Sequence, residues 1–227
     1  MTDVKRFAVI LTHNRPELLS ECVAAISPQV DEMIVIDNAS NPAVRKADLV
    51  CDPACSVKLI QVPDQPPNLS RFWNLGIDTA VGSSDPGQLS YVAFLCDDAI
   101  VPSGWFAAVS AAMTATGAAA GCSSDRLAPG QHDLKLSPDS DLWGRMVGWA
   151  FIVDTTKGIR ADEDMHWWWG DSTVDFEARG RGGMVTTGGF SVSNARPNDF
   201  TFNKPELAER AGKDGEAFVA RWGFRPW

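Results

Sequence analysis

The sequence predicts an α/β protein, a single domain in which a mixed, mainly parallel sheet is flanked by helices. Strand-like and helix-like segments alternate over the first hundred residues. Each strand candidate is an unbroken apolar run, which is typical of parallel strands buried on both faces. Polar clusters also follow three of these runs, and ligands bind at the carboxyl ends of the strands in such sheets. The clusters are Thr12-His13-Asn14-Arg15, Asp37-Asn38 and Asp97-Asp98.

The first half supplies four strands and two helices. The apolar runs predict strands over 7–11, 33–36, 57–62 and 91–95. After the first strand, Asn14 is expected to cap a helix, and Pro16 suits its first turn. Apolar residues then recur at helical spacing up to Ile26. A second helix is predicted over 70–81, and the segments rich in proline, glycine and asparagine between these elements read as turns.

The second half is less regular. An alanine-rich helix is predicted over 105–116, followed by a long polar loop over 123–141. Strands are predicted over 149–153 and 184–187, on either side of an acidic, tryptophan-rich segment. A mixed tail follows the last strand. No linker-like segment divides the chain, so one domain spanning residues 1–227 is expected.

Composition excludes several classes of function. The chain has 227 residues and a formal net charge of -9, with 20 Lys+Arg against 29 Asp+Glu. An acidic chain without a basic cluster is poorly suited to binding nucleic acid. The chain also has no run of 18 apolar residues, so no transmembrane helix is predicted. The five cysteines are scattered, and Cys51–Cys55 has no second pair at zinc spacing. Reduced thiols and a cytoplasmic location are expected.

Four fragments, taken in order, resemble the inverting glycosyltransferases of family 2, which have the GT-A fold. The fragments are AVILTHNRPELL, VIDNAS, Asn74-Leu75-Gly76-Ile77 and FLCDDAIVPSGWF. The family usually shows Thr-Tyr-Asn-Arg, Val-Asp-Asn-Gly-Ser, Asn-x-Gly-Ile and Leu-Asp-Asp-Asp with Pro and Trp downstream. The resemblance implies a nucleotide-binding half over 1–104 and an acceptor-binding half with a C-terminal tail over 105–227.

The resemblance also implies a donor site for a nucleotide sugar, with a UDP-sugar expected. Short polar side chains at strand ends can hold a nucleoside, and a guanidinium on the second helix could meet phosphate. Turn formation and helix capping are the alternative roles for these residues. The expected nucleotide-binding residues are Thr12, His13, Asn14, Arg15, Asp37, Asn38, Arg71, Asn74 and Asp97.

The acidic pair after the fourth strand resembles the family's site for Mn²⁺ or Mg²⁺, hard cations that take carboxylate oxygens and bridge to diphosphate. When the fragment is aligned with the family's pattern at Pro102 and Trp105, Cys96 stands where the family has its first acidic residue. Asp98 is expected to bind the metal, with Asp97 beside it on the metal or the ribose. A late histidine ligand of many relatives is absent, because residues 190–194 read FSVSN.

The catalytic base is expected in the second half. Asp171 lies nine residues after Asp162, the interval customary in the family, and Gly170 replaces the usual glutamate. Asp171 is therefore the expected base, with Asp175 as the competitor. At least one ring of the run Trp167-Trp168-Trp169 is expected to line a sugar site, since flat apolar rings suit the C–H faces of pyranoses.

Together these residues predict an inverting hexosyltransferase that acts on a hydroxyl of a glycan, a protein or a small molecule. One alternative is a catalytically inactive module that still binds a nucleotide sugar, which Cys96 and the missing histidine favour. The other is a nucleotidyltransferase of similar fold, which the lack of a glycine-rich loop after the first strand disfavours.

Overall fold

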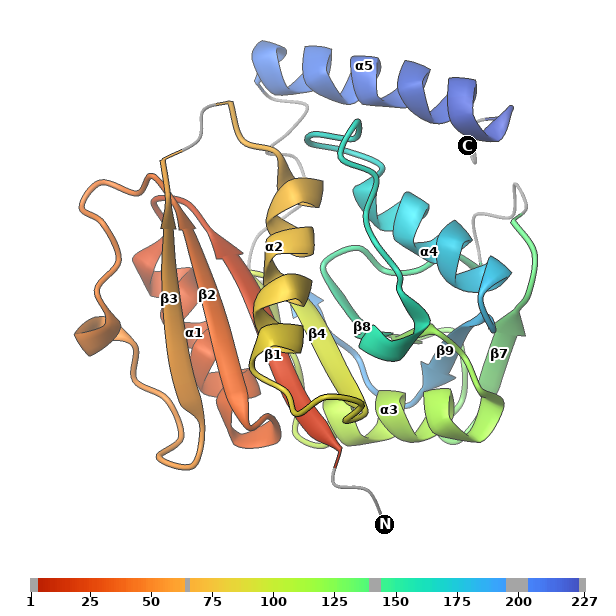
Figure 1. The fold of residues 1–227 in the computed structure, drawn as a ribbon, viewed down its shortest axis with the longest axis horizontal. Helices are drawn as coiled ribbons and strands as arrows, with labels where there is room; N and C mark the ends of the chain where they lie inside the picture. The colour runs from red at the N-terminus through yellow and green to blue at the C-terminus, as the bar shows by residue number, and fades with distance from the viewer. Residues whose placement is uncertain (1–3, 64–65, 139–143, 195–203, 225–227) are drawn as a thin grey trace.

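A computed structural model describes residues 4–63, 66–138, 144–194 and 204–224. Its centre is an eight-stranded sheet in the order β3-β2-β1-β4-β8-β6-β9-β7, with helices on both faces (Figure 1). The strands are β1 (Lys5–Thr12), β2 (Glu32–Asn38), β3 (Ser56–Val62), β4 (Ser90–Cys96), β6 (Ala120–Ser124), β7 (His132–Lys135), β8 (Ala150–Asp154) and β9 (Met184–Gly188). A small second sheet pairs β5 (Ala99–Ile100) with β10 (Ser193–Asn194). This is the predicted mixed, mainly parallel α/β fold.

Strands β1 to β4 are mutually parallel, so their carboxyl ends share one edge of the sheet. β1 lies between β2 and β4, with Thr12 opposite Asp37 and Leu11 opposite Cys96. The polar residues that follow these strands are thereby brought together at that edge. β8 then runs antiparallel to β4, and it joins the second half of the chain to the same sheet.

The two faces of the sheet bury two separate apolar clusters. Alternate residues of β1 point to opposite faces, as strand geometry requires. Ala8 and Ile10 pack with α1 (Pro16–Ile26) and α3 (Trp105–Thr116). Phe7 and Val9 pack with α2 (Leu69–Gly82) and α4 (Gly170–Gly180). Both faces of the sheet are therefore covered by helices and excluded from water. This explains why the strand sequences are continuous apolar runs.

Close packing explains the glycine of the Asn-x-Gly-Ile fragment. A Cβ atom at Gly76 would lie 2.7 Å from both Cγ atoms of Val9. Helix α2 can approach β1 this closely only where its residue has no side chain. The fragment is thus a helix–sheet contact, and it positions the start of α2 near the shared strand edge.

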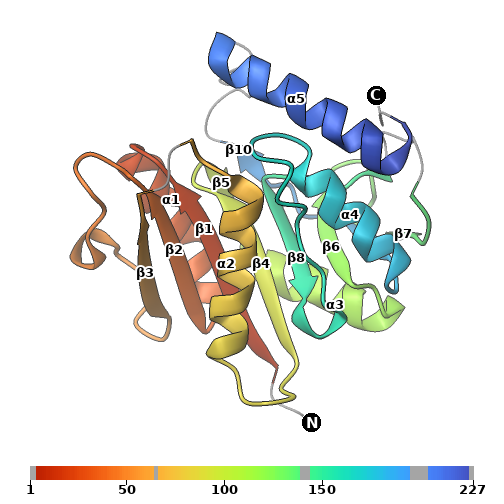
Figure 2. The ribbon, with the colours of Figure 1, turned by 45° about the horizontal axis from the view of Figure 1, so that its top comes forward.

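The last helix, α5 (Pro205–Trp222), lies across the strand-end edge above α4, as both views show (Figures 1 and 2). Phe218 is fully buried there and packs against Trp169 and Phe176 at ring-centroid distances of 5.1 and 5.7 Å. These rings, with Met165, form a third apolar cluster. None of the described helices is long and apolar enough to cross a membrane.

Several sequence expectations for local structure are wrong. Asn14 does not cap α1, because it adopts a left-handed conformation (φ 55°) and Arg15 takes the capping position. The expected polar loop over 123–141 contains strand β7, and its residues 139–141 lie outside the described part of the chain. The tryptophan-rich segment leads into helix α4, and the tail forms helix α5.

Candidate active site

The two adjacent carboxylates after β4 are held by residues that follow β1. Thr12 Oγ1 donates a hydrogen bond to Asp97 Oδ2 at 2.9 Å. Arg15 Nη1 lies 3.1 Å from Asp97 Oδ1 and 3.5 Å from Asp98 Oδ2. Asp97 is only 5% exposed. A buried carboxylate beside another is tolerated because a hydroxyl and a guanidinium compensate its charge.

The titration of this acidic turn reflects its burial. Burial raises the pKa of Asp97, against the opposing effects of the Arg15 guanidinium and the Thr12 hydroxyl. Burial also raises the pKa of the neighbouring Cys96 thiol, and the charges of Asp98, Asp97 and Asp171 raise it further. Cys96 is therefore a neutral thiol at physiological pH, unlike the acidic residue that it replaces.

Asp171 belongs to the same site as the acidic turn. It lies in the first turn of α4, and residues 148–149 link it to the turn, because the Trp149 carbonyl accepts a hydrogen bond from the Cys96 backbone N–H at 3.0 Å. Its Oδ1 accepts a hydrogen bond from the Ser172 backbone N–H at 2.8 Å. Its Oδ2 lies so close to Gly148 that a side chain there would collide with it. Residues about 75 positions apart in the chain thus form one acidic site.

The loops after β1 and β2 are joined to each other by side chains. His13 Nδ1 lies 2.5 Å from the Asn38 carbonyl oxygen, and Asn14 Nδ2 lies 3.0 Å from His13 Nε2. A carbonyl only accepts, so this network assigns the proton to Nδ1 and makes Nε2 the acceptor. Asn14 Oδ1 accepts from the Asn41 backbone N–H at 2.6 Å. The expected nucleotide-binding residues of the first two strands therefore form one connected rim.

A hollow of about 380 Å³ lies beside this rim, between the start of α1 and residues 40–49. Asn14 and Arg15 line it on one side, and Ser40 and Val44 line it on the other. Asp97, Asp98 and Asp171 are not among its lining residues. Arg15, which lines the hollow, connects it to the acidic turn.

Asp37 has a structural role that its position at a strand end did not reveal. It is fully buried, and its two carboxylate oxygens accept from the backbone N–H groups of Ser40 and Val44 at 3.1 and 2.9 Å. Both of its carboxylate oxygens therefore have partners inside the protein. Asp37 shapes the loop that carries Ser40, because it satisfies two of its backbone donors.

On α2, the two expected nucleotide-binding residues differ. Asn74 is buried, and its Nδ2 donates to the Ala161 carbonyl at 2.9 Å and to Glu163 Oε1 at 3.0 Å. Its Oδ1 accepts from the Ala161 backbone N–H at 3.0 Å. Its amide therefore attaches α2 to the segment before the tryptophan run and is not directed at a ligand. Arg71 lies on the exposed face of α2.

Asp175, the expected competitor of Asp171, is part of a buried ion pair. Its Oδ1 lies 2.7 Å from Arg179 Nε, with the two side chains 1% and 0% exposed. Its Oδ2 accepts from the Met146 backbone N–H at 3.0 Å. A carboxylate with both oxygens occupied inside the protein cannot reach an acceptor hydroxyl. Asp175 is thus enclosed by the core, whereas Asp171 is half-buried at the start of α4.

The tryptophan run divides between the core and the partly exposed surface. Trp169 is 4% exposed and packs on Phe218, so its ring belongs to the core. Trp167 and Trp168 are half-buried. Their backbone N–H groups both donate to Asp214 Oδ2 on α5, at 2.6 and 2.7 Å. Helix α5 thereby holds the segment that ends at Asp171.

The family assignment follows from the sequence match. The family model described as glycosyl transferase family 2 matches residues 7–166, which include the loops after β1, β2 and β4. The chain belongs to glycosyl transferase family 2. It is a glycosyltransferase, and helices α4 and α5 lie beyond the matched region.

Solved structures with the same fold include TarS of S. aureus. A fragment, TarS 1-349, aligns with a TM-score of 0.63 at 13% identity, covering 97% of this chain and 72% of that fragment. A longer TarS structure aligns at 0.61 and 12% identity, with 44% of that chain covered. The fragment was also solved with UDP-GlcNAc, and that structure aligns at 0.55. At this identity the likeness shows the GT-A fold. No curated protein matches the chain.

Sequence reasoning about this family 2 chain missed Asp214. The sequence pattern could have indicated that Asp214 is buried, because it recurs at helical spacing with the apolar residues of α5. The buried residues in this pattern are Leu207, Ala211, Asp214 and Phe218. An acidic residue on the buried side of an amphipathic helix indicates a specific partner. The identity of that partner, the backbone of the tryptophan run, is not encoded in the local pattern.

A divalent cation at the acidic turn would need oxygen ligands from the side chains around it. No group of three or more histidine, cysteine or acidic side chains within the described ranges is arranged to hold a metal. Mg²⁺, however, is usually bound through one or two carboxylates plus substrate phosphates. Asp98 fits this kind of site better than Asp97. Its side chain is 13% exposed and lies 3.5 Å from Arg15, whereas Asp97 is held by Thr12 at 2.9 Å and by Arg15 at 3.1 Å.

Proposed function

We propose that this family 2 protein transfers a hexose from a UDP-sugar to a hydroxyl group of a glycan, a protein or a small molecule, with inversion at the anomeric carbon. The observation that carries the proposal is the packing of the Asp171 carboxylate against Gly148, since the next residue, Trp149, accepts a hydrogen bond from Cys96 at the start of the acidic turn. The UDP and UDP-GlcNAc complexes of TarS support a uridine donor for this chain by analogy of fold.

Inversion requires a single displacement, with a base on the acceptor side of the sugar. Asp171 is the carboxylate for that role, because it adjoins the acidic turn and, unlike Asp175, forms no ion pair with any described residue. It takes the proton of the acceptor hydroxyl as the hydroxyl oxygen attacks C1 of the hexose. The bond from C1 to the diphosphate oxygen breaks on the opposite side, and UDP leaves.

Positive charge near the departing diphosphate comes from Arg15, which lies between the β1 loop and the acidic turn. Mn²⁺ or Mg²⁺, held by Asp98 beside Asp97, would add charge neutralisation when bound. The rim made by Thr12, His13, Asn14 and Asn38 would hold the nucleoside. We place the reaction in the cytoplasm, consistent with five free cysteines.

The experiment is product detection by mass spectrometry with UDP-hexoses and a panel of hydroxyl acceptors, beside a calorimetric UDP titration. Asp171→Asn should lower transfer by about 10²- to 10⁴-fold, the usual contribution of a general base. UDP affinity should stay unchanged, because the base faces the acceptor. Asp164→Asn, an exposed carboxylate on the same segment, is the matched control.

Wild-type transfer by the folded Asp171→Asn protein would refute the assignment of the base. UDP binding without transfer to any acceptor would instead favour the inactive nucleotide-sugar-binding module that Cys96 suggests. Release of pyrophosphate from a nucleotide triphosphate would indicate the nucleotidyltransferase.

A further inference from the structure

Strand β7 forms one edge of the eight-stranded sheet, and β3 forms the other. The connection between β2 and β3 runs along the outer side of β3 (Figures 1 and 2), and Gln61 of β3 donates from Nε2 to the Val44 carbonyl in it at 2.9 Å. Among the described residues, no strand pairs with the outer side of β7, which Figure 1 shows at the side of the molecule. Unpaired backbone groups of an edge strand are a template for pairing with another chain.

The ladder with β9 determines which backbone groups of β7 point outward. His132 lies opposite Thr187 in this antiparallel pair, and the Gly188 N–H donates to the Gln131 carbonyl at 3.0 Å. In an antiparallel pair, residues that bond to the partner strand alternate with residues that do not. Residues 131, 133 and 135 therefore bond to β9, whereas the N–H and C=O groups of His132 and Leu134 point away from the sheet.

The same alternation separates the charged side chains of β7 from the apolar ones. Asp133 and Lys135 share one face of the strand, with Asp133 Oδ2 3.6 Å from Lys135 Nζ and side chains that are 46% and 24% exposed. Leu134 and Leu136 share the other face, above Gly183 of the neighbouring segment, and Leu136 is 59% exposed. The edge thus carries one charge of each sign, two residues apart, and apolar surface on its opposite face.

The charges select one antiparallel register between two copies of the chain. In a two-fold pair, residue i of one copy meets residue j of the other, and j meets i. With the axis at Leu134, Asp133 lies opposite Lys135 of the second copy, and the reverse pair forms as well. An axis at residue 133 or 135 would set two carboxylates or two ammonium groups opposite each other, and like charges in that position are destabilising. The axis at Leu134 therefore gives two favourable pairs, and it brings Leu136 of each copy to His132 of the other.

We propose that β7 pairs antiparallel with β7 of a second copy around Leu134, so that the two sheets become continuous. The outward backbone groups of His132 and Leu134 then find partners in the other copy, and the exposed side chain of Leu136 is covered. A contact through one short strand buries far less than the roughly 1,200–2,000 Å² of a stable complex, so the dimer is weak, with a dissociation constant on the order of 10–100 μM. The proposal does not depend on the reaction that the protein catalyses.

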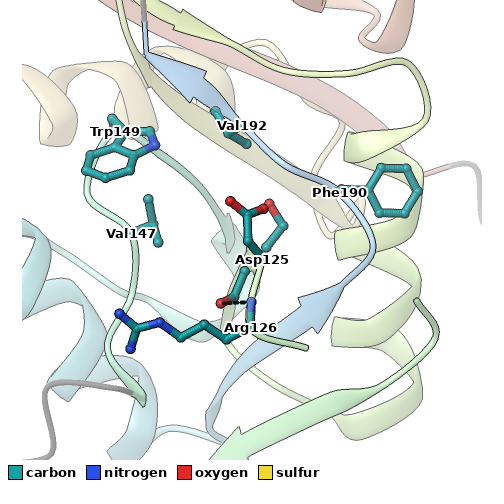
Figure 3. A pocket seen from close by; sticks show the side chains of 8 residues that line it. Asp125, Arg126, Val147, Trp149, Phe190 and Val192 are labelled. Carbon is teal, nitrogen blue, oxygen red and sulfur yellow. Dashed lines mark hydrogen bonds between the residues drawn. The ribbon is translucent and has the colours of Figure 1, made fainter. Parts of the chain in front are cut away.

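The contact adjoins a hollow of about 220 Å³ at the sheet edge where β6 ends (Figure 3). Its walls are Val147, Trp149, Phe190 and Val192, and Asp125 and Arg126 lie at its polar end. Residues 127–131 connect this polar end to β7, and hydrogen bonds of 3.0 and 3.1 Å between Ala128 and Gln131 close their turn. No residue from 132 to 136 lines the hollow. Pairing through β7 would therefore hold the end of this connection without using any residue of the hollow.

Sedimentation velocity measures the association. Between about 1 μM and about 1 mM, the range of weak contacts, the wild-type protein should change from monomer to dimer. Asp133→Lys and Lys135→Asp each set like charges opposite one another in both cross-copy pairs, so each should raise the dissociation constant about 10- to 100-fold. Glu216→Lys, an exposed charge reversal on α5, is the matched control and should leave the constant unchanged.

Mixing the two variants tests the register itself. The Asp133→Lys chain has a lysine at both positions and the Lys135→Asp chain has an aspartate at both, so a heterodimer regains two pairs of opposite charge. The mixture should associate about as tightly as the wild-type protein, although each variant alone does not. Thermal unfolding of each dilute variant at the wild-type temperature would show that β7 is intact.

Hydrogen exchange, measured by NMR for single amides, gives a readout that needs no variant. Exchange of the His132 and Leu134 amides should slow as the protein concentration rises, because these N–H groups become bonded to the second copy. The amides of Asp133 and Lys135 already bond to β9, so their exchange should change much less.

A chain that stays monomeric up to about 1 mM would overturn the proposal. A dimer that responds to Asp133→Lys no more than to Glu216→Lys would also overturn it, because the chains would then meet through another surface. The same holds for a mixture of the two folded variants that does not associate, since the register around Leu134 would then be wrong.

Discussion

Asp214 Oδ2 accepts a hydrogen bond from the Trp167 backbone N–H at 2.6 Å, across 47 residues of sequence. The same oxygen accepts from the next N–H of the chain at 2.7 Å. Arg221, further along the same helix, lies 2.8 Å from Asp162 Oδ2 and 2.9 Å from Glu177 Oε1. Helix α5 therefore holds both ends of the segment that carries Asp171.

Asp214→Ala should reduce both stability and transfer. It leaves two backbone donors without their acceptor, and we expect a loss of about 1–3 kcal/mol in the free energy of unfolding. Transfer should fall at saturating substrate while UDP affinity is unchanged, since Asp171 would lose its positioning and the nucleotide rim would not. Denaturant unfolding and kinetics measure the two effects.

Asp214→Asn, which keeps an acceptor oxygen, should restore part of both effects. Glu216→Ala, an exposed change on the same helix, is the matched control. Unaltered transfer by Asp214→Ala would show that α5 does not position the base.

Asp175→Asn should destabilise the protein strongly, because it leaves Arg179 charged and buried without its partner. Removal of one member of a buried ion pair typically costs about 3–5 kcal/mol. The matched control is Glu209→Gln, which breaks an exposed pair with the same i,i+4 spacing on α5 and should leave stability almost unchanged. Chemical denaturation of the two variants gives the comparison, and equal effects would contradict the buried assignment.

Affinity for UDP with Mn²⁺ should fall on acidification, and the fall should begin above the ordinary aspartate pKa of about 3.9. Burial raises the pKa of Asp97, so this carboxylate is charged above its raised pKa and neutral below it. A cation at the turn needs the charged form. The contribution of Asp97 to UDP affinity is therefore complete at higher pH and is lost as the pH falls through the raised pKa.

Calorimetry over this pH range, with Asp97→Asn as the reference, measures the effect. The variant should bind more weakly at neutral pH and lose most of the pH dependence. A variant with the wild-type pH profile would remove Asp97 from the titration.

Cys96→Asp should give the turn the three carboxylates that the family usually has. We expect it to lower the stability of the protein when no metal is bound. Cys96 already lies near the charges of Asp97, Asp98 and Asp171, so a fourth carboxylate would be repelled. In EDTA we expect a loss on the order of 1–3 kcal/mol, or about 2–4 °C in Tm for each kcal/mol in a chain of this size. Mn²⁺ should recover this loss.

Cys96→Ser, which adds no charge, is the control for the shape change. A Cys96→Asp protein that is unaffected by EDTA and by Mn²⁺ alike would indicate that position 96 does not face the cation site.

Elements that are long, periodic or continuously apolar were predictable from the sequence alone. The buried strands β1 to β4 and helix α3 were predicted because their apolar pattern is a local property. The approach of Thr12 to Asp97 was also accessible, since parallel neighbouring strands end at one edge of a sheet. The same rule predicts that Asp37 and Asn38 lie at that edge.

Which polar side chains are used inside the protein depends on the tertiary structure. Asp37 and Asn74 were expected to bind nucleotide and Asp175 to compete as the base, yet their polar atoms contact backbone groups or Arg179. Trp149 looks like an ordinary strand residue, yet its indole donor lines a hollow. Hydrogen-bond partners far apart in the chain depend on how β8, α4 and α5 pack on the sheet, and no local pattern specifies that packing.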